Sequence, residues 1–224
     1  MEINYFTEKE ARRRDRIVRG YFGENGIEQV VKTVVSRLIS SPKLKADAKI
    51  LDVGAGSGIF TLRVADALKR HLTTVSFYAM DATPAMLLAL DKKTDLITPF
   101  FGIAENIAES VQEAREYAEV PARFDALFST LMLHHCPDVE KVMKSMRTVL
   151  KDSGKVVIID LCSHNFTEFR HEMGDVYLGF DPKMIRETAK KMFSEVTVKK
   201  LRGICCKSSG RRADLFVATL IAGS

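Results

Sequence analysis

The sequence lacks the features of a disulfide-stabilised or membrane-spanning protein. It holds only four cysteines, and two of them, Cys205 and Cys206, are adjacent and cannot easily bridge each other. No apolar run approaches the ~20 residues that cross a bilayer. Residues 1–8 have neither the basic nor the apolar region of a secretory signal. We therefore expect a cytoplasmic protein without membrane contact.

Signs of a domain boundary are missing as well. The 224 residues contain no internal repeat, low-complexity tract or linker rich in proline, glycine and serine. A length of 224 residues is ordinary for one α/β domain. We expect a single domain, 1–224, with an N-terminal helical lid (1–45), a ligand-binding core (46–165) and a substrate-side segment with a terminal hairpin (166–224).

The charge pattern does not favour a nucleic-acid partner. The net charge is +5, but basic and acidic residues alternate along most of the chain. The basic residues between 9 and 19 are interrupted by acidic ones, and apolar positions such as Val18 and Phe22 indicate the inner face of a solvated helix. Because no basic motif is interleaved with aromatic residues, nucleic acid is an open but less favoured partner.

Apolar spacing predicts strands that alternate with helices. The predicted strands are 49–53, 75–80, 97–101, 126–131, 156–161, 196–204 and 214–221. The predicted helices are 8–20, 27–40, 59–71, 84–91, 107–117, 139–150 and 182–191. This alternation favours an α/β fold with a mostly parallel seven-stranded sheet. The last two strands have no helix between them and should form an antiparallel hairpin.

The turn after the first strand points to a bound ligand. Asp52 is followed by glycines at 54, 56 and 58, and ligands of open α/β sheets bind beyond the carboxyl ends of the strands. Glycine lets the backbone approach a ligand closely. A dinucleotide fingerprint, G-x-G-x-x-G, would need glycine where Ile59 stands. The buried carboxylate of Asp52 would suit a cationic or polar ligand group.

A second carboxylate, Asp81, ends the next strand. At that position it can accept hydrogen bonds from both hydroxyls of a ribose, which favours a nucleoside ligand. The alternative is that Asp81 only caps the helix that begins near Pro84.

Four stretches of the chain resemble class I S-adenosylmethionine-dependent methyltransferases, among them the ubiquinone and menaquinone methyltransferases. The stretches are ILDVGAGSG (50–58), YAMDATPAM (78–86), FDALFSTLMLHHCPD (124–138) and MRTVLKDSGKVVIID (146–160). The resemblance implies a Rossmann-like fold and S-adenosyl-L-methionine as cofactor. It also implies a role in cofactor binding for Asp52, Gly54, Ala55, Gly56, Gly58, Asp81, Ala82, Met86, Thr130 and Leu131.

One position departs from the family pattern. Where relatives often carry an acidic residue that accepts from the adenine amino group, this chain has Ile103. Adenine is then held by the backbone of Ile103 and Ala104, or by Glu105 or Asn106 if the loop register shifts. A narrower similarity, over 161–180, is to methyltransferases related to those fused to arsenic-repressor-type regulators.

The candidate catalytic residues are His134 and His135. Methyl transfer from a sulfonium is an in-line displacement in which proximity and desolvation supply most of the acceleration, and a protein base is optional. Both histidines follow the fourth strand, where one could accept a proton from the acceptor. The alternative is that they only bond loop backbone.

Three further residues follow neighbouring strands and could join the same rim: Cys136, Cys162 and His164. Soft ligands of this kind would suit a thiophilic acceptor. No C-x-x-C or H-x-x-x-H spacing is present, and we therefore predict no metal site.

The sequence thus predicts methyl transfer to a small-molecule acceptor, whose pocket is completed by residues 164–180. Two alternatives remain: a methyltransferase of RNA or protein, and a noncatalytic module that only binds S-adenosylmethionine. A homodimer is compatible with the sequence.

Overall fold

The computed structural model describes residues 8–72, 74–172, 174–208 and 210–223, so the first seven residues of the predicted lid lie outside the described part. The strands are β1 (Lys49–Val53), β2 (Ser76–Asp81), β3 (Ile97–Phe101), β4 (Phe124–Thr130), β5 (Leu150–Leu161), β6 (Glu195–Ser208) and β7 (Arg211–Ile221). The α-helices are α1 (Glu8–Ile39), α2 (Thr61–Lys69), α3 (Pro84–Asp91), α4 (Ile107–Ala114), α5 (Val139–Val149), α6 (Glu168–Glu172) and α7 (Pro182–Lys190). Two short 3₁₀ helices are η1 (Ala104–Asn106) and η2 (Leu133–His135).

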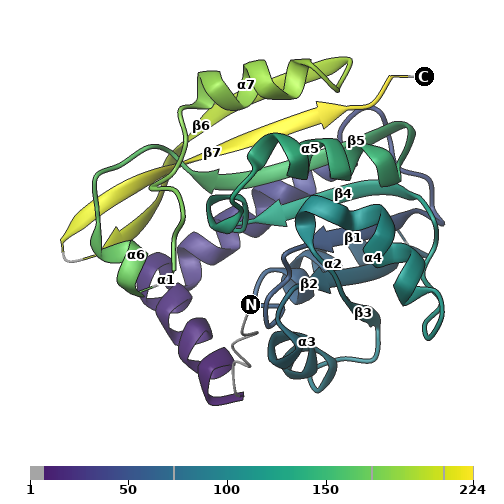
Figure 1. The fold of residues 1–224 in the computed structure, drawn as a ribbon, viewed down its shortest axis with the longest axis horizontal. Helices are drawn as coiled ribbons and strands as arrows, with labels where there is room; N and C mark the ends of the chain where they lie inside the picture. The colour runs from purple at the N-terminus through teal and green to yellow at the C-terminus, as the bar shows by residue number, and fades with distance from the viewer. Residues whose placement is uncertain (1–7, 73, 173, 209, 224) are drawn as a thin grey trace.

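The strands form one sheet in the order β3-β2-β1-β4-β5-β7-β6 (Figure 1). Strands β1 to β5 pair in parallel, whereas β7 is antiparallel to both β5 and β6. The predicted α/β class and antiparallel C-terminal hairpin are confirmed. Because β1 lies between β2 and β4, the strand order reverses there, and open sheets of this kind bind ligands at that switch point.

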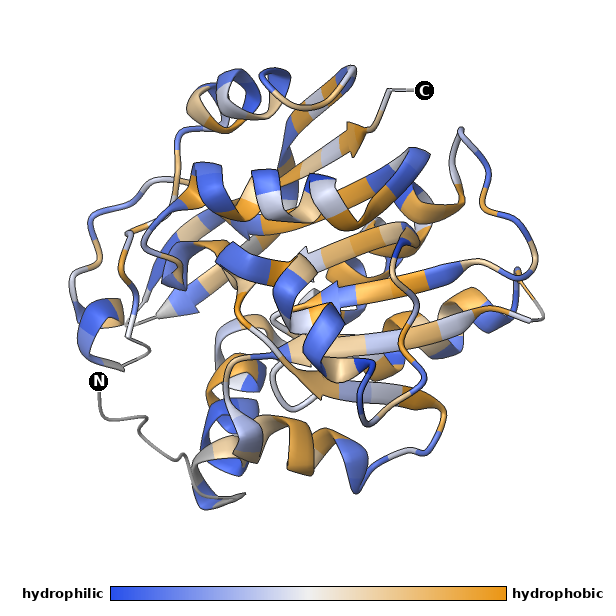
Figure 2. Cartoon of the chain, turned by 45° about the vertical axis from the view of Figure 1, so that its right-hand side comes forward, coloured by the Kyte–Doolittle hydropathy of each residue, from blue (hydrophilic) through white to orange (hydrophobic). Residues whose placement is uncertain are grey.

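Each face of the sheet has its own apolar core, because successive strand residues point to opposite sides. On β5, Val157 and Ile159 pack with α1 and α2, whereas Val156 and Ile158 pack with α4, α5 and α7. Figure 2 shows hydrophobic residues along the central strands and many hydrophilic residues on the helices that cover them. None of the helices in the described part of the chain combines the length and the apolar composition of a bilayer-crossing segment.

Helix α1 consists of two helical pieces that meet at Gly23, whose φ of 61° and ψ of 169° are not helical. Two N-terminal helices, 8–20 and 27–40, were predicted, and Gly23 lies in the gap between them. The second piece is buried against the sheet through residues such as Ile27 and Leu38. Its end is held by the buried Lys155 of β5, whose Nζ donates to the carbonyl oxygens of Arg37 (3.3 Å) and Ser40 (2.5 Å). Burial lowers the pKa of Lys155 to about 8.

The first piece of α1 lies beside α6 (Figure 1). Between the two helices, the rings of Tyr21 and Phe169 stack with centroids 5.2 Å apart. Helix α6, η1 and η2 were not predicted, because segments of three to five residues are too short to show a helical period. Of these, η2 and α6 shape the candidate site.

Candidate active site

A pocket opens at the carboxyl ends of the central strands, under the first piece of α1. Its lining includes Gly54, Ala55, Gly56, Asp81, Met86, Thr130, Leu131, His134 and His135 from the predicted site. Its lining also includes Arg14, Asp15, Val18, Tyr21, Phe22, Phe60, Met132, Leu161, Phe169, Asp175 and Cys206. One concave site therefore joins the predicted cofactor residues to both predicted catalytic histidines.

The glycine turn is held against the end of β2 by its backbone. The N–H groups of Gly54 and Ala55 both donate to the carbonyl oxygen of Met80, at 2.8 and 3.0 Å. Gly54 has a φ of +78°, and a Cβ there would lie 2.1 Å from Cγ of Met132. Gly56, by contrast, has open space where a Cβ would stand. The turn thus presents bare backbone to the pocket, as the close approach of a ligand requires.

Asp81 both braces the turn and faces the pocket. Its Oδ2 accepts from the Gly56 N–H and its Oδ1 from the Thr83 N–H, each at 2.8 Å. Burial raises the pKa of Asp81, and these backbone donors oppose the rise. A carboxylate has about four lone-pair positions, so acceptor capacity remains for a ribose. Asp81 can therefore brace the turn that precedes α3 and bind a ligand at the same time.

Asp52 lies behind the turn and not in the pocket lining. Its Oδ2 accepts from the Thr61 hydroxyl at 2.6 Å, while its Oδ1 is buried without a hydrogen-bond partner. Burial raises the pKa of Asp52 to about 7. An unpartnered carboxylate oxygen beside a bare backbone turn fits the polar, cationic methionine part of S-adenosylmethionine.

Four other predicted cofactor residues are also absent from the lining. Gly58, with a φ of +84°, packs against α3, where a Cβ would meet Leu90 at 2.4 Å. Ala82 is exposed in the turn after β2. The Ile103 N–H donates to the Ser110 hydroxyl at 3.0 Å, and Ala104 begins η1. Adenine contacts from Ile103 and Ala104 therefore stay a prediction.

His134 is tied to a carboxylate that the sequence did not single out. Its Nδ1 lies 2.6 Å from Oδ1 of Asp160, and its backbone N–H donates to Oδ2 of the same residue at 3.3 Å. Asp160 is fully buried in β5, and its Oδ1 also accepts from the Leu161 N–H at 2.6 Å. Burial lowers the pKa of His134, but Asp160 and Asp175 raise it by more. A carboxylate within an apolar strand must be paired, and this signal could have revealed Asp160.

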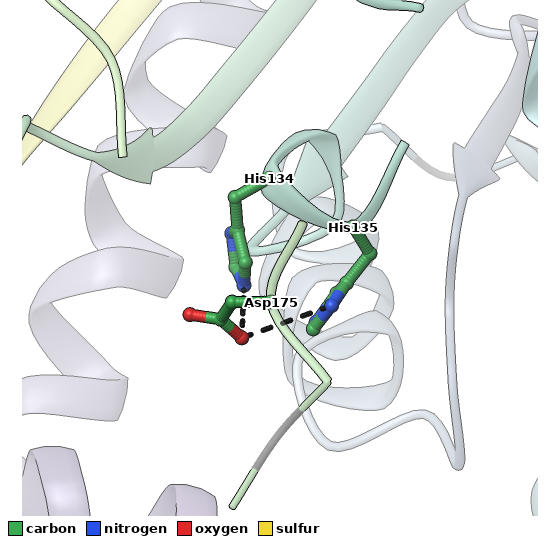
Figure 3. A group of neighbouring side chains, drawn as sticks. All are labelled: His134, His135 and Asp175. Carbon is green, nitrogen blue, oxygen red and sulfur yellow. Dashed lines mark ion pairs between the residues drawn. The ribbon is translucent and has the colours of Figure 1, made fainter. Parts of the chain in front are cut away.

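A second missed carboxylate, Asp175, lies beside His134 and His135 (Figure 3). Its Oδ1 lies 3.5 Å from Nε2 of His134 and 3.8 Å from Nδ1 of His135. The Val176 and Tyr177 N–H groups donate to the His134 carbonyl, which holds this segment on η2. Burial raises the pKa of Asp175 to about 6, and burial lowers that of His135 to about 3.

The remaining residues of the predicted rim lie elsewhere. Cys136 and Cys162 are buried in the core beneath α5 and α7, and burial raises the pKa values of their thiols to about 12 and 11. His164 stacks on Phe166 with ring centroids 4.9 Å apart. None of the three is among the described residues that line the pocket.

The sheet order, the glycine turn and the strand-terminal Asp81 together define a class I S-adenosylmethionine-dependent methyltransferase. The chain belongs to the methyltransferase-domain family, whose model matches residues 24–206, and its cofactor is S-adenosylmethionine.

Similar proteins have names that describe different activities. The chain is 24% identical over 149 residues to a highly reducing polyketide synthase of Gibberella zeae, covering 65% of this chain and 6% of that protein. It is 27% identical over 114 residues to a ubiquinone/menaquinone biosynthesis C-methyltransferase of Rickettsia peacockii, covering 51% of this chain and 44% of that one. The chain thus spans less than half the length of either relative.

The fold is similar to that of phosphoethanolamine N-methyltransferase 2 of Haemonchus contortus, solved in complex with S-adenosyl-L-methionine. The TM-score is 0.67 at 17% identity, over 100% of this chain and 59% of that one.

Proposed function

We propose that the chain transfers the methyl group of S-adenosylmethionine to a small-molecule acceptor from which His134 removes a proton. The observation that carries this proposal is the buried His134–Asp160 pair, in the same pocket as the glycine turn and Asp81. Cofactor and base would thus meet the acceptor from two sides.

The hydrogen bond to Asp160 sets the state of the imidazole. If Nδ1 carries the proton and donates it to Asp160, then Nε2 holds a lone pair directed away from β5, toward Asp175 and the pocket. S-adenosylmethionine supplies an electrophilic methyl group on a sulfonium sulfur. The acceptor's electron pair would form the new bond to that carbon as the sulfur leaves with the bonding pair, and Nε2 would take the acceptor's proton. Asp160 stabilises the resulting imidazolium.

The lining supports an acceptor with an apolar body. The apolar side chains of Val18, Phe22, Leu131 and Phe169 line the pocket, and polar side chains such as those of Asp81, His134 and Asp175 stand among them. A base is useful only where the acceptor must lose a proton, as a carbon acid, a phenol or an ammonium does. The C-methyltransferase of Rickettsia peacockii carries a name that fits the first of these classes. RNA or protein would need a broad open face beside the cofactor, whereas these residues line a concave pocket.

The first piece of α1 would serve as a lid. The Ser57 hydroxyl of the glycine turn donates to Asp15, and Lys93 lies 3.1 Å from the same carboxylate. These contacts fasten the helix over the turn, and Tyr21 continues the cover toward α6. The cofactor would then be enclosed between Asp81, Met86, Thr130 and Leu131 below and the lid above, with water excluded during transfer.

Two measurements test the proposal. Calorimetry should show binding of S-adenosylmethionine and of its demethylated product, and binding of NAD in their place would overturn the cofactor assignment. A cofactor-consumption screen with acceptors sorted into carbon acids, phenols, amines, thiols, metalloids and RNA should then show turnover with one of the first three classes. Binding without turnover on any acceptor would favour the noncatalytic module.

A further inference from the structure

We propose that His134, His135 and Asp175 form a binding site for a divalent transition-metal ion of the zinc type, which competes with the proton for Nε2 of His134. Each residue offers one ligand atom, and the three atoms lie within 4.8 Å of one another (Figure 3). Two imidazole nitrogens and one carboxylate oxygen form a common ligand set for such ions.

The distances are close to those of a metal site. A tetrahedral ion about 2.0–2.1 Å from each ligand places the ligand atoms roughly 3.3 Å apart. Nε2 of His134 and Oδ1 of Asp175 are 3.5 Å apart, which is near that value. Nδ1 of His135 is 3.8 Å from the same oxygen and 3.4 Å from the carbonyl oxygen of Gly174, so this ring must turn from Gly174 toward Asp175 to complete the triangle.

The surroundings of the ligands support the same conclusion. Asp160 bonds Nδ1 of His134 at 2.6 Å, which is how a carboxylate commonly orients a metal-binding histidine through its other nitrogen. Asp175 is 5% exposed, and its Oδ1 is buried without a hydrogen-bond partner. A buried oxygen in this state normally has a cation, a water or a donor beside it. The sequence missed this set because Asp175 lies far from the two histidines along the chain.

Three protein ligands leave a fourth position open toward the pocket, as in catalytic rather than structural zinc sites. An ion at the site uses the Nε2 lone pair, so His134 can no longer accept a proton. Metal binding would therefore switch transfer off. This consequence rests on the proposed role of His134, whereas the binding of the ion does not.

The test is a titration of the full chain, stripped of metal with a chelator, with Zn²⁺ by calorimetry and with Co²⁺ by visible absorption. We expect one equivalent to bind, with the intense absorption of a four-coordinate Co²⁺ centre. Asp175→Asn and His135→Gln should each weaken Zn²⁺ binding at least ~10²-fold, because changes in the outer shell alone cost about 10- to 100-fold. His71→Gln, which removes an exposed histidine outside the pocket, should have no effect.

Calorimetry with S-adenosylmethionine separates the possible results. Retained cofactor binding by Asp175→Asn shows that this variant is folded, so its loss of Zn²⁺ binding is specific. Asp81→Ala should lose cofactor affinity and keep Zn²⁺ affinity, which separates failure of the cofactor site from failure of the metal site. Equal Zn²⁺ affinity in wild type and Asp175→Asn, no binding to wild type, or loss of binding in His71→Gln would overturn the proposal.

Discussion

At one end of the pocket, a single turn between β1 and α2 presents backbone to the ligand. At the other end, His134 and Asp175 present side chains from two separate segments, and Asp160 of β5 supports His134 from outside the lining. The first end depends on glycine conformations, which are local. The second end depends on contacts between ionisable side chains that lie far apart in the sequence, so the loss of one side chain changes the surroundings of the others. Substitutions should therefore separate cofactor affinity from turnover.

The sharpest test of this separation is His134→Gln. General-base catalysis contributes roughly 10²- to 10⁴-fold, so we expect kcat to fall by at least ~10²-fold while cofactor affinity stays unchanged. Steady-state kinetics with an active acceptor and calorimetry with S-adenosylmethionine measure the two quantities. His164→Gln, outside the pocket lining, is the matched control. Normal turnover of His134→Gln would mean that proximity alone carries the reaction.

A pH-dependent test concerns Asp52 at the cofactor end. Burial raises its pKa to about 7 in the folded chain, against an ordinary value of 3.8. Between these values the folded state binds more protons than the unfolded state, so the free energy of unfolding falls as pH rises, by at most about 1.4 kcal/mol per pH unit. Above about pH 7 this contribution is flat.

Denaturant unfolding without cofactor, from about pH 4 to pH 8, should show this decline in the wild type. Asp52→Asn should lack the part that Asp52 contributes, because its side chain does not titrate. Identical slopes for the two proteins would show that Asp52 keeps an ordinary pKa.

The two ends also differ in how far the sequence predicts them. The strand alternation and the turn at Asp52 to Gly58 lie within contiguous stretches, so periodicity and spacing were sufficient to predict the sheet and the position of Asp81 at the end of β2. Asp160 and Asp175 were not singled out as partners of His134. Asp160 meets His134 only because β5 lies next to β4, and Asp175 lies in a segment without regular structure. Cys136 and Cys162 follow β4 and β5, as predicted, but their side chains pack into the core and not into the pocket.

A smaller effect is expected from Asp81→Ala. Removal of a charged acceptor should weaken S-adenosylmethionine binding by about 1–3 kcal/mol and leave single-turnover chemistry at saturating cofactor nearly unchanged. Because Asp81 also accepts from the Gly56 and Thr83 N–H groups, Asp81→Asn is the control: its Oδ1 can still accept one of these bonds. Unchanged calorimetric affinity in Asp81→Ala would reduce its role to bracing the turn.

The smallest effect is expected from the double variant Cys136→Ala, Cys162→Ala. With pKa values near 12 and 11, both thiols are protonated at neutral pH, and a protonated thiol is a poor nucleophile and a poor metal ligand. We expect kcat and cofactor affinity to stay within about twofold of wild type, with a loss of roughly 1 kcal/mol of stability per site from the lost packing.

Cys206→Ser is the comparison, because Cys206 lines the pocket. If the double variant loses turnover while Cys206→Ser does not, the acceptor end extends to thiols that the folded chain holds in its core, and a thiophilic acceptor such as arsenite becomes the substrate class to test.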